Sequence, residues 1–122
     1  MMDAMGGRFV IQEHTTEAGS HYDVMLEAGQ ALATWRLETL PGDLAAGEAA
    51  AAEALPDHRR AYLSYEGEIS GGRGRVRIAD RGEYRLHARD EDRWAFDLAG
   101  ELATGRFELT RLAGPHWELR AV

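Results

Sequence analysis

Residues 21–37, HYDVMLEAGQALATWRL, carry the pattern that decides the fold. In the first half of this stretch, residues 21–28, apolar side chains alternate with a second set that is largely polar. The two sets are Tyr22, Val24 and Leu26 on one side, and His21, Asp23, Met25 and Glu27 on the other. Alternate side chains of a β-strand lie on opposite faces of the sheet, so this alternation predicts a strand. The Gly-Gln pair at residues 29–30 favours a two-residue turn, so we expect an antiparallel hairpin whose second strand covers residues 31–37.

Short runs of the same kind continue on both sides of this hairpin. Their spacing of about 8–12 residues, with turn-forming residues between them, is typical of a barrel or sandwich. Predicted strands cover residues 9–12, 62–64, 74–79, 82–88, 93–98, 105–112 and 117–121, and predicted turns cover residues 71–72, 80–82, 89–92 and 113–115. Trp35, Trp94 and Trp117 fall in strands and are expected in the core. The sequence therefore predicts a mostly β fold: a small closed or partly closed antiparallel β-barrel with at most one short helix.

The stretch PGDLAAGEAAAAEA, residues 41–54, is compatible with two structures. Its alanines permit a short helix after the Pro-Gly break. A loop followed by a strand over residues 50–55 fits the same residues. We expect residues 1–7 to form a flexible N-terminal tail and residues 8–122 to form a single domain, large enough to bury a core.

Composition excludes several classes of protein. The absence of cysteine excludes disulfides and thiolate metal sites, so any metal must bind imidazole and carboxylate groups. The chain also lacks lysine, which excludes Schiff-base chemistry, Walker-A phosphate binding and ligase adenylation. A net charge of −7 argues against a general electrostatic grip on nucleic acid, although a local basic groove is compatible with it. No apolar run approaches the ~20 residues of a membrane span, and no secretory signal is present, so we expect a cytoplasmic protein without a membrane partner.

His21 and Asp23 are two residues apart on a predicted strand, so both side chains leave the same face. His14 lies just beyond the preceding strand, and the short connection at residues 15–20 allows it to fold back beside His21. Two imidazoles and one carboxylate form a three-ligand site with open positions, which suits Zn²⁺, Mn²⁺ or a similar divalent ion. The alternative is that these residues are exposed polar groups on a solvated strand.

His58 and Tyr62 are four residues apart in PDHRRAYLSYEG, residues 56–67. A histidine and a phenol placed together can stabilise a phosphate oxyanion or transfer a proton. The alternative is a loop histidine beside a core tyrosine. His87 and His116 have no acidic or histidine partner at a useful spacing and are expected on the surface.

Several motifs occur in a fixed order along the chain. They are RFVIQEH, HYDxxLE, a tryptophan strand, DHxxxY, YEGEI with a glycine-rich turn, VxIxDRG and DLAGELATGRFELTRL. This ordered set resembles the 3′-phosphoesterase domain of bacterial DNA ligase D, from about Arg8 to Leu112. We expect a shortened, stand-alone relative of that domain, without polymerase or ligase modules.

The resemblance implies a β-barrel with a metal site in a surface groove, with manganese among the supporting metals. It implies an activity that removes 3′-phosphates and 3′-terminal ribonucleotides from nucleic-acid ends, or that acts on another phosphate ester. The implied metal ligands are His14, His21 and Asp23. The implied phosphate contacts are His58 and Tyr62, which we assign as catalytic. Gln12 corresponds to the glutamine of the opening QxH motif of the family, and we assign it to substrate binding. A repair polymerase or ligase acting in trans is the implied protein partner.

The chain departs from the pattern of the family at four places. Met25 stands where the resemblance expects an arginine, and Ala50 falls near a second expected arginine. The spacing from His14 to His21 is one residue longer than usual, and the glycine turn after Glu66 is shorter. Arg36, Arg59 and Arg60 are the candidates to replace the missing charge, and we assign Arg59 and Arg60 to substrate binding. The alternative function is a catalytically weak or inactive module that binds metal or phosphate and recognises a nucleic-acid end or a protein partner.

Overall fold

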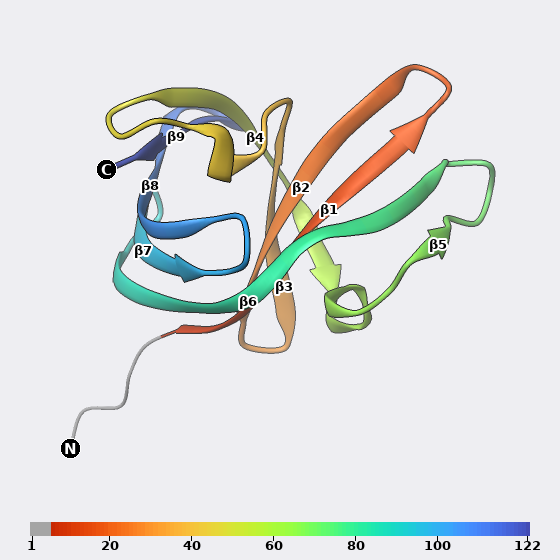
Figure 1. Ribbon diagram of the computed structural model, residues 1–122, viewed down its shortest axis with the longest axis horizontal. Coiled ribbons are helices and arrows are strands. Elements are labelled where there is room, and N and C mark those ends of the chain that lie inside the picture. The colour runs from red at the N-terminus through yellow and green to blue at the C-terminus, as the bar shows by residue number, and fades with distance from the viewer. Residues whose placement is uncertain (1–5) are drawn as a thin grey trace.

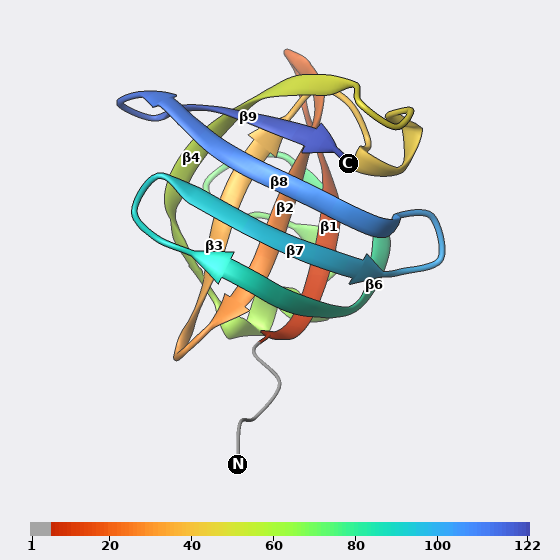
Figure 2. The same cartoon turned by 90° about the vertical axis from the view of Figure 1, so that its left-hand side faces the viewer.

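The computed structural model describes residues 6–122 as one sheet that closes on itself (Figure 2). The strands are β1 (Gly6–Thr16), β2 (Gly19–Ala28), β3 (Ala31–Leu37), β4 (Ala49–Arg59), β5 (Gly67–Glu68), β6 (Arg75–Arg89), β7 (Arg93–Ala99), β8 (Thr104–Ala113) and β9 (His116–Ala121), with short 3₁₀ helices η1 (Pro41–Asp43) and η2 (Arg60–Leu63). Neighbours pair antiparallel in the order β1-β2-β3-β4-β9-β8-β7-β6-β5, and an additional β1–β6 pairing closes the ring. The fold is thus a closed barrel of eight strands, with β5 attached to β6, which confirms the predicted class.

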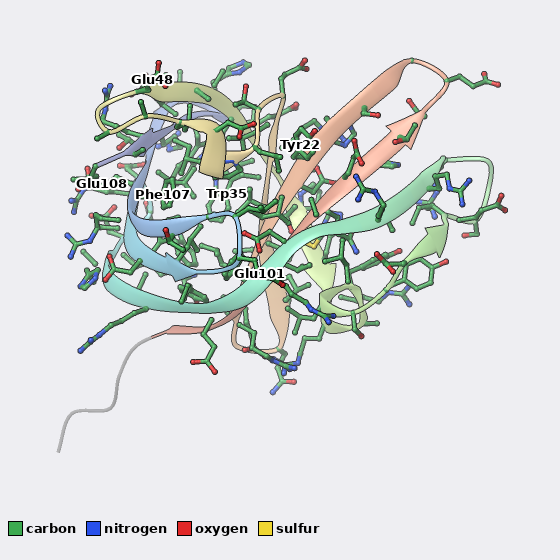
Figure 3. The ribbon with its side chains drawn as sticks, viewed as in Figure 1. Tyr22, Trp35, Glu48, Glu101, Phe107 and Glu108 are labelled. Carbon is green, nitrogen blue, oxygen red and sulfur yellow. The ribbon has the colours of Figure 1, made fainter. Side chains whose placement is uncertain are left out.

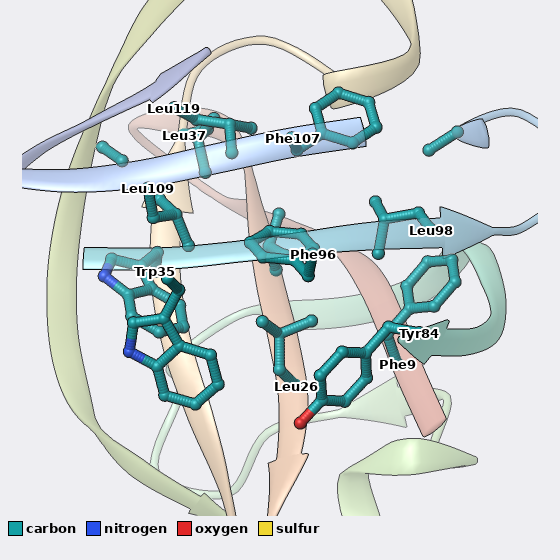
Figure 4. Close-up of a cluster of buried hydrophobic side chains, with 14 of the residues drawn as sticks. Phe9, Leu26, Trp35, Leu37, Tyr84, Phe96, Leu98, Phe107, Leu109 and Leu119 are labelled. Atoms are coloured by element: carbon teal, nitrogen blue, oxygen red, sulfur yellow. The ribbon is translucent and has the colours of Figure 1, made fainter. Parts of the chain in front are cut away.

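The core fills the interior of the barrel, where the strands contribute alternate residues (Figure 4). Trp35 is central to it, because its ring meets those of Trp94 and Trp117 edge to face at centroid distances of 5.2 and 5.5 Å. Such pairs are favoured by the charge distribution of aromatic rings. All three tryptophans are buried, as the alternation predicts.

A second, smaller apolar cluster lies on the other face of the first strands. Val10, Met25 and Leu32 are fully buried there, and Tyr62 and Leu63 of η2 pack against them. These three residues belong to the alternate set that does not enter the main core. The η2 segment therefore covers part of the outer surface of β1, β2 and β3.

The predicted strand boundaries hold for β2, β3, β7, β8 and β9 within one or two residues. Residues 41–54 take the second of the two expected forms, with η1 and a loop before β4, and β4 continues to Arg59. Residues 62–64 are not a strand, because residues 62 and 63 belong to η2 and Ser64 is the turn residue that follows it. Strand β1 begins at Gly6, earlier than expected, and the remainder of the predicted tail, residues 1–5, lies outside the described residues. Neither short helix in the described part of the chain is long and apolar enough to cross a bilayer.

Residues 80–82 are not a turn, which is a correction to the predicted pattern. Strand β6 runs through them, with a register shift opposite Ile11 and Gln12. Asp80 is buried, and its carboxylate accepts backbone N–H groups from residues 101, 102 and 103 at 2.9, 3.1 and 2.7 Å. The aspartate therefore caps the distant β7–β8 connection and does not make a local turn.

We expect Asp80→Ala to lower the free energy of unfolding by about 3 kcal/mol, because backbone N–H groups at residues 101–103 lose a charged acceptor. Urea unfolding followed by tryptophan fluorescence measures this change. Glu91→Ala, an exposed carboxylate in the β6–β7 turn, is the matched control and is expected to stay within about 0.5 kcal/mol of the parent protein. Equal stabilities for the two variants would contradict the capping role.

Candidate metal centre

Strands β1 and β2 bring the three predicted metal ligands onto one face of one hairpin. His14 lies directly opposite His21, and Asp23 is two residues further along β2, opposite Gln12. Tyr22, between them, packs against the main core with Trp35 and so lies on the other face (Figure 3). The ligands therefore lie on the outer surface, where the hairpin and the start of β6 extend away from the β7–β9 side of the barrel (Figure 1).

The ligand atoms of His14, His21 and Asp23 all lie within 4.8 Å of one another. His14 Nδ1 is 3.1 Å from His21 Nε2, which is 3.3 Å from Asp23 Oδ1. His14 Nε2 lies 2.7 Å from the Arg73 carbonyl oxygen. A carbonyl only accepts hydrogen bonds, so Nε2 of His14 carries the proton and its Nδ1 lone pair points toward the cluster. A partner of this kind on the outer nitrogen is usual for histidines that bind metals.

Burial and charge prepare His21 and Asp23 for a cation. Burial lowers the pKa of His21 below its usual value, and Arg36 and His14 act in the same direction, while the Asp23 carboxylate opposes them. The imidazole is therefore neutral near pH 7 and has a lone pair to offer. Asp23 is buried, and its Oδ1 has no hydrogen-bond partner among residues 6–122. A buried carboxylate oxygen without a partner is costly, and a bound cation would remove that cost.

His58 and Tyr62 also come together, but as a separate pair. His58 lies near the end of β4, opposite Leu32, and its ring meets the Tyr62 ring edge to face at 5.7 Å. Nδ1 of His58 donates to the Pro56 carbonyl at 3.0 Å, which leaves Nε2 available to another group. Tyr65 continues the aromatic group, with its ring 5.7 Å from that of Tyr62.

Gln12 connects the two groups. Its side chain is buried, and its amide nitrogen donates to the carbonyl oxygens of Tyr62 and Tyr65 at 3.1 and 3.0 Å. The same residue lies opposite Asp23 in the β1–β2 register. Gln12 thus binds one backbone carbonyl in η2 and one just after it, and so positions η2 against β1.

We expect Gln12→Leu to lower the free energy of unfolding by about 2 kcal/mol, because two backbone carbonyl groups lose their donor. The affinity for a divalent ion is expected to be retained, since the ligand atoms are unchanged. Urea unfolding and metal titration measure the two quantities. The control is Gln30→Leu, because Gln30 is exposed in the β2–β3 turn. A Gln12 variant of unchanged stability would contradict the positioning role.

The three candidate arginines have different surroundings. Arg59 lies over the Tyr62 ring, 6.0 Å from its centroid. Arg60 forms an ion pair with Glu27 and donates to the Gly29 carbonyl at 3.3 Å. Arg36 lies beside the predicted metal ligands, with its Nε 3.9 Å from Asp23 Oδ1.

The fold and the site define a small antiparallel β-barrel with a candidate centre of two histidines and one aspartate on its outer surface. The model of the DNA ligase D 3′-phosphoesterase domain family matches residues 12–111, so the chain belongs to that family. This match confirms the resemblance drawn from the ordered motifs and identifies a 3′-phosphoesterase domain of DNA repair. The matched range begins at Gln12 and contains the three ligand residues and the His58–Tyr62 pair. A search of curated proteins gave no match to this chain.

Proposed function

We propose that this domain is a metal-dependent phosphoesterase that acts on the 3′ ends of nucleic acid. The reaction is hydrolysis of a terminal 3′-phosphate to a 3′-hydroxyl and inorganic phosphate, or removal of a 3′-terminal ribonucleotide. His14, His21 and Asp23 would hold a divalent ion, Mn²⁺ or Zn²⁺, both of which accept imidazole and carboxylate ligands. When bound, such an ion supplies Lewis-acid polarisation of a phosphate group and makes a coordinated water more acidic than bulk water.

One observation carries this proposal: the buried Asp23 Oδ1 has no hydrogen-bond partner among the described residues, and one ring nitrogen of each histidine lies within 4.8 Å of an Asp23 carboxylate oxygen. The His14 proton is held on the outer nitrogen by Arg73, so its lone pair is already directed inward. On an exposed polar strand face, water would bind the carboxylate oxygen and the histidine nitrogens, so neither an unpartnered oxygen nor an oriented ring would be expected.

The His58–Tyr62 pair supports the choice of a phosphate ester as substrate. Because Nδ1 of His58 donates to the Pro56 carbonyl, the ring is oriented and its Nε2 can accept a proton; once protonated, Nε2 can donate to a phosphate oxygen. The Tyr62 hydroxyl is a second donor beside it. Because this pair is adjacent to the metal ligands and not merged with them, an extended ligand such as a polynucleotide terminus suits the arrangement. A repair polymerase or ligase acting in trans would use the 3′-hydroxyl product.

The test is an assay of the metal-stripped and metal-reloaded chain on 5′-labelled primer-templates. One primer ends in a 3′-phosphate, one in a 3′-ribonucleotide and one in a 3′-hydroxyl. We expect Mn²⁺ or Zn²⁺ to restore conversion of the first two substrates, and release of inorganic phosphate from the first. His116→Ala, which removes an exposed histidine on β9, is the control variant. Tight metal binding without any product, at high protein concentration, would overturn the proposal and leave a non-catalytic binding module.

A further inference from the structure

Arg36 lies between two acidic positions on the outer face of the barrel. It is opposite Asp23 in the β2–β3 pairing and opposite Glu53 in the β3–β4 pairing. Its side chain is 39% exposed, so the guanidinium reaches solvent, but its Nε is buried. The Arg36 side chain therefore extends from the predicted metal ligands to the solvent-exposed surface beside them.

The contact between Arg36 and Asp23 is incomplete. Arg36 Nε and Asp23 Oδ1 are 3.9 Å apart, and neither atom has a hydrogen-bond partner within residues 6–122. A distance of this size is too long for a hydrogen bond. One buried acceptor, Asp23 Oδ1, and one buried donor, Arg36 Nε, are thus left without a hydrogen bond beside each other.

Other arginines of this barrel form closed pairs with carboxylates. The Arg93–Glu108, Arg106–Asp97 and Arg111–Asp92 pairs have N–O distances of 2.8, 2.8 and 2.7 Å. Such distances are usual when an arginine binds a carboxylate directly. Arg36 is different, because its carboxylate neighbour lies beside the two histidines and the guanidinium has no direct carboxylate partner within residues 6–122.

Positions 25, 59 and 60 do not supply a positive charge beside Asp23. Met25 is fully buried in the small apolar cluster, so position 25 contributes no charge to the site. Arg60 is paired with Glu27, and Arg59 lies over Tyr62. Within residues 6–122, Arg36 is therefore the arginine whose guanidinium lies beside a predicted metal ligand.

We propose that Arg36 binds the phosphate group that the metal centre receives, by donating to a non-bridging oxygen of a terminal phosphate ester. This inference rests on the proposed function. A cation bound by Asp23 would be the missing partner of the carboxylate oxygen, and an anion bound by that cation would accept hydrogen bonds from the solvent-exposed part of the Arg36 guanidinium. Arginine suits this role, because its planar donors match phosphate oxygens and its charge is permanent.

The test compares Arg36→Ala and Arg36→Lys with the parent protein in two separate titrations. The first measures Mn²⁺ affinity without phosphate, and the second measures the affinity of the Mn²⁺-loaded protein for inorganic phosphate and for a 3′-phosphorylated oligonucleotide. We expect Arg36→Ala to weaken phosphate binding by about 10- to 100-fold, as for the loss of one charged hydrogen bond. Mn²⁺ affinity is expected to stay equal or to rise, because a positive charge next to Asp23 is removed. Arg36→Lys is expected to recover part of the loss.

Arg93→Ala is the matched control, because Arg93 pairs with Glu108 on β8, away from the site. Equal phosphate affinity in the parent protein and Arg36→Ala would overturn the role of Arg36 and leave the proposed function intact. A parallel loss of Mn²⁺ and phosphate affinity in both Arg36 variants would also overturn it, since that result indicates a structural role. A parent protein that binds no Mn²⁺ would overturn the proposed function itself.

Discussion

Asp23→Asn is expected to abolish metal-dependent activity while making the metal-free protein more stable. The asparagine keeps the shape of the side chain but has no charge to attract a divalent ion, so we expect metal affinity to fall at least ~100-fold. In the metal-free protein, the variant no longer buries an unpartnered carboxylate oxygen, and the free energy of unfolding is expected to rise by about 1 kcal/mol. Opposite signs in the two measurements are the signature of a ligand site.

Thermal unfolding with and without metal measures both effects. At a metal concentration of about 100 times its dissociation constant, the parent protein gains about 2.7 kcal/mol from binding, and Asp23→Asn gains almost none. Asp97→Asn is the control, because Asp97 is an exposed aspartate that pairs with Arg106 and His87. Metal-dependent stabilisation that survives Asp23→Asn would contradict the assignment of this residue as a ligand.

His58→Ala is expected to lower phosphoesterase activity by about 100- to 10,000-fold, the range for loss of a positioned acid or base. Metal affinity is expected to be unchanged, because His58 belongs to the aromatic group and not to the ligand cluster. Rates on a 3′-phosphate primer and metal titrations measure the two quantities separately.

Two further variants sharpen the interpretation of His58. Tyr62→Phe keeps the ring that packs against the cluster of Val10, Met25 and Leu32 and removes the hydroxyl, so it tests the phenol without disturbing packing. His116→Ala controls for the loss of any surface histidine. A His58→Ala protein with parental rates would show that the His58–Tyr62 pair serves packing alone.

Local patterns predicted the hairpin and the shared face of His21 and Asp23, because a strand fixes the direction of every second side chain. The same local reasoning was wrong for residues 80–82. Their Asp-Arg-Gly sequence favours a turn, yet the Asp80 carboxylate binds backbone groups about twenty residues away. A side chain at Gly82 would collide with the Ala99 carbonyl, so this glycine permits close strand packing.

Most of the contacts that could not be predicted from the sequence join residues on different strands. His87, expected to lack an acidic partner, contacts Asp97 at 2.8 Å, because β6 and β7 are neighbours. The neighbourhood of Arg36 and Asp23 depends in the same way on strand register. The anchoring of Tyr62 by Gln12 joins residues 50 positions apart and has no local signature at all.

Closure of the barrel has a consequence for the order of folding. The pairing of β1 with β6 joins residues about seventy positions apart, and His14 lies within that seam, opposite Val76. Contacts over such separations form slowly, because the entropy of loop closure is lost before the contacts stabilise the chain. The Arg73 carbonyl that orients His14 comes from the same distant segment. We therefore expect β1 and β2 to form a hairpin early, and the centre to acquire its full affinity for metal only when the last seam of the barrel has closed.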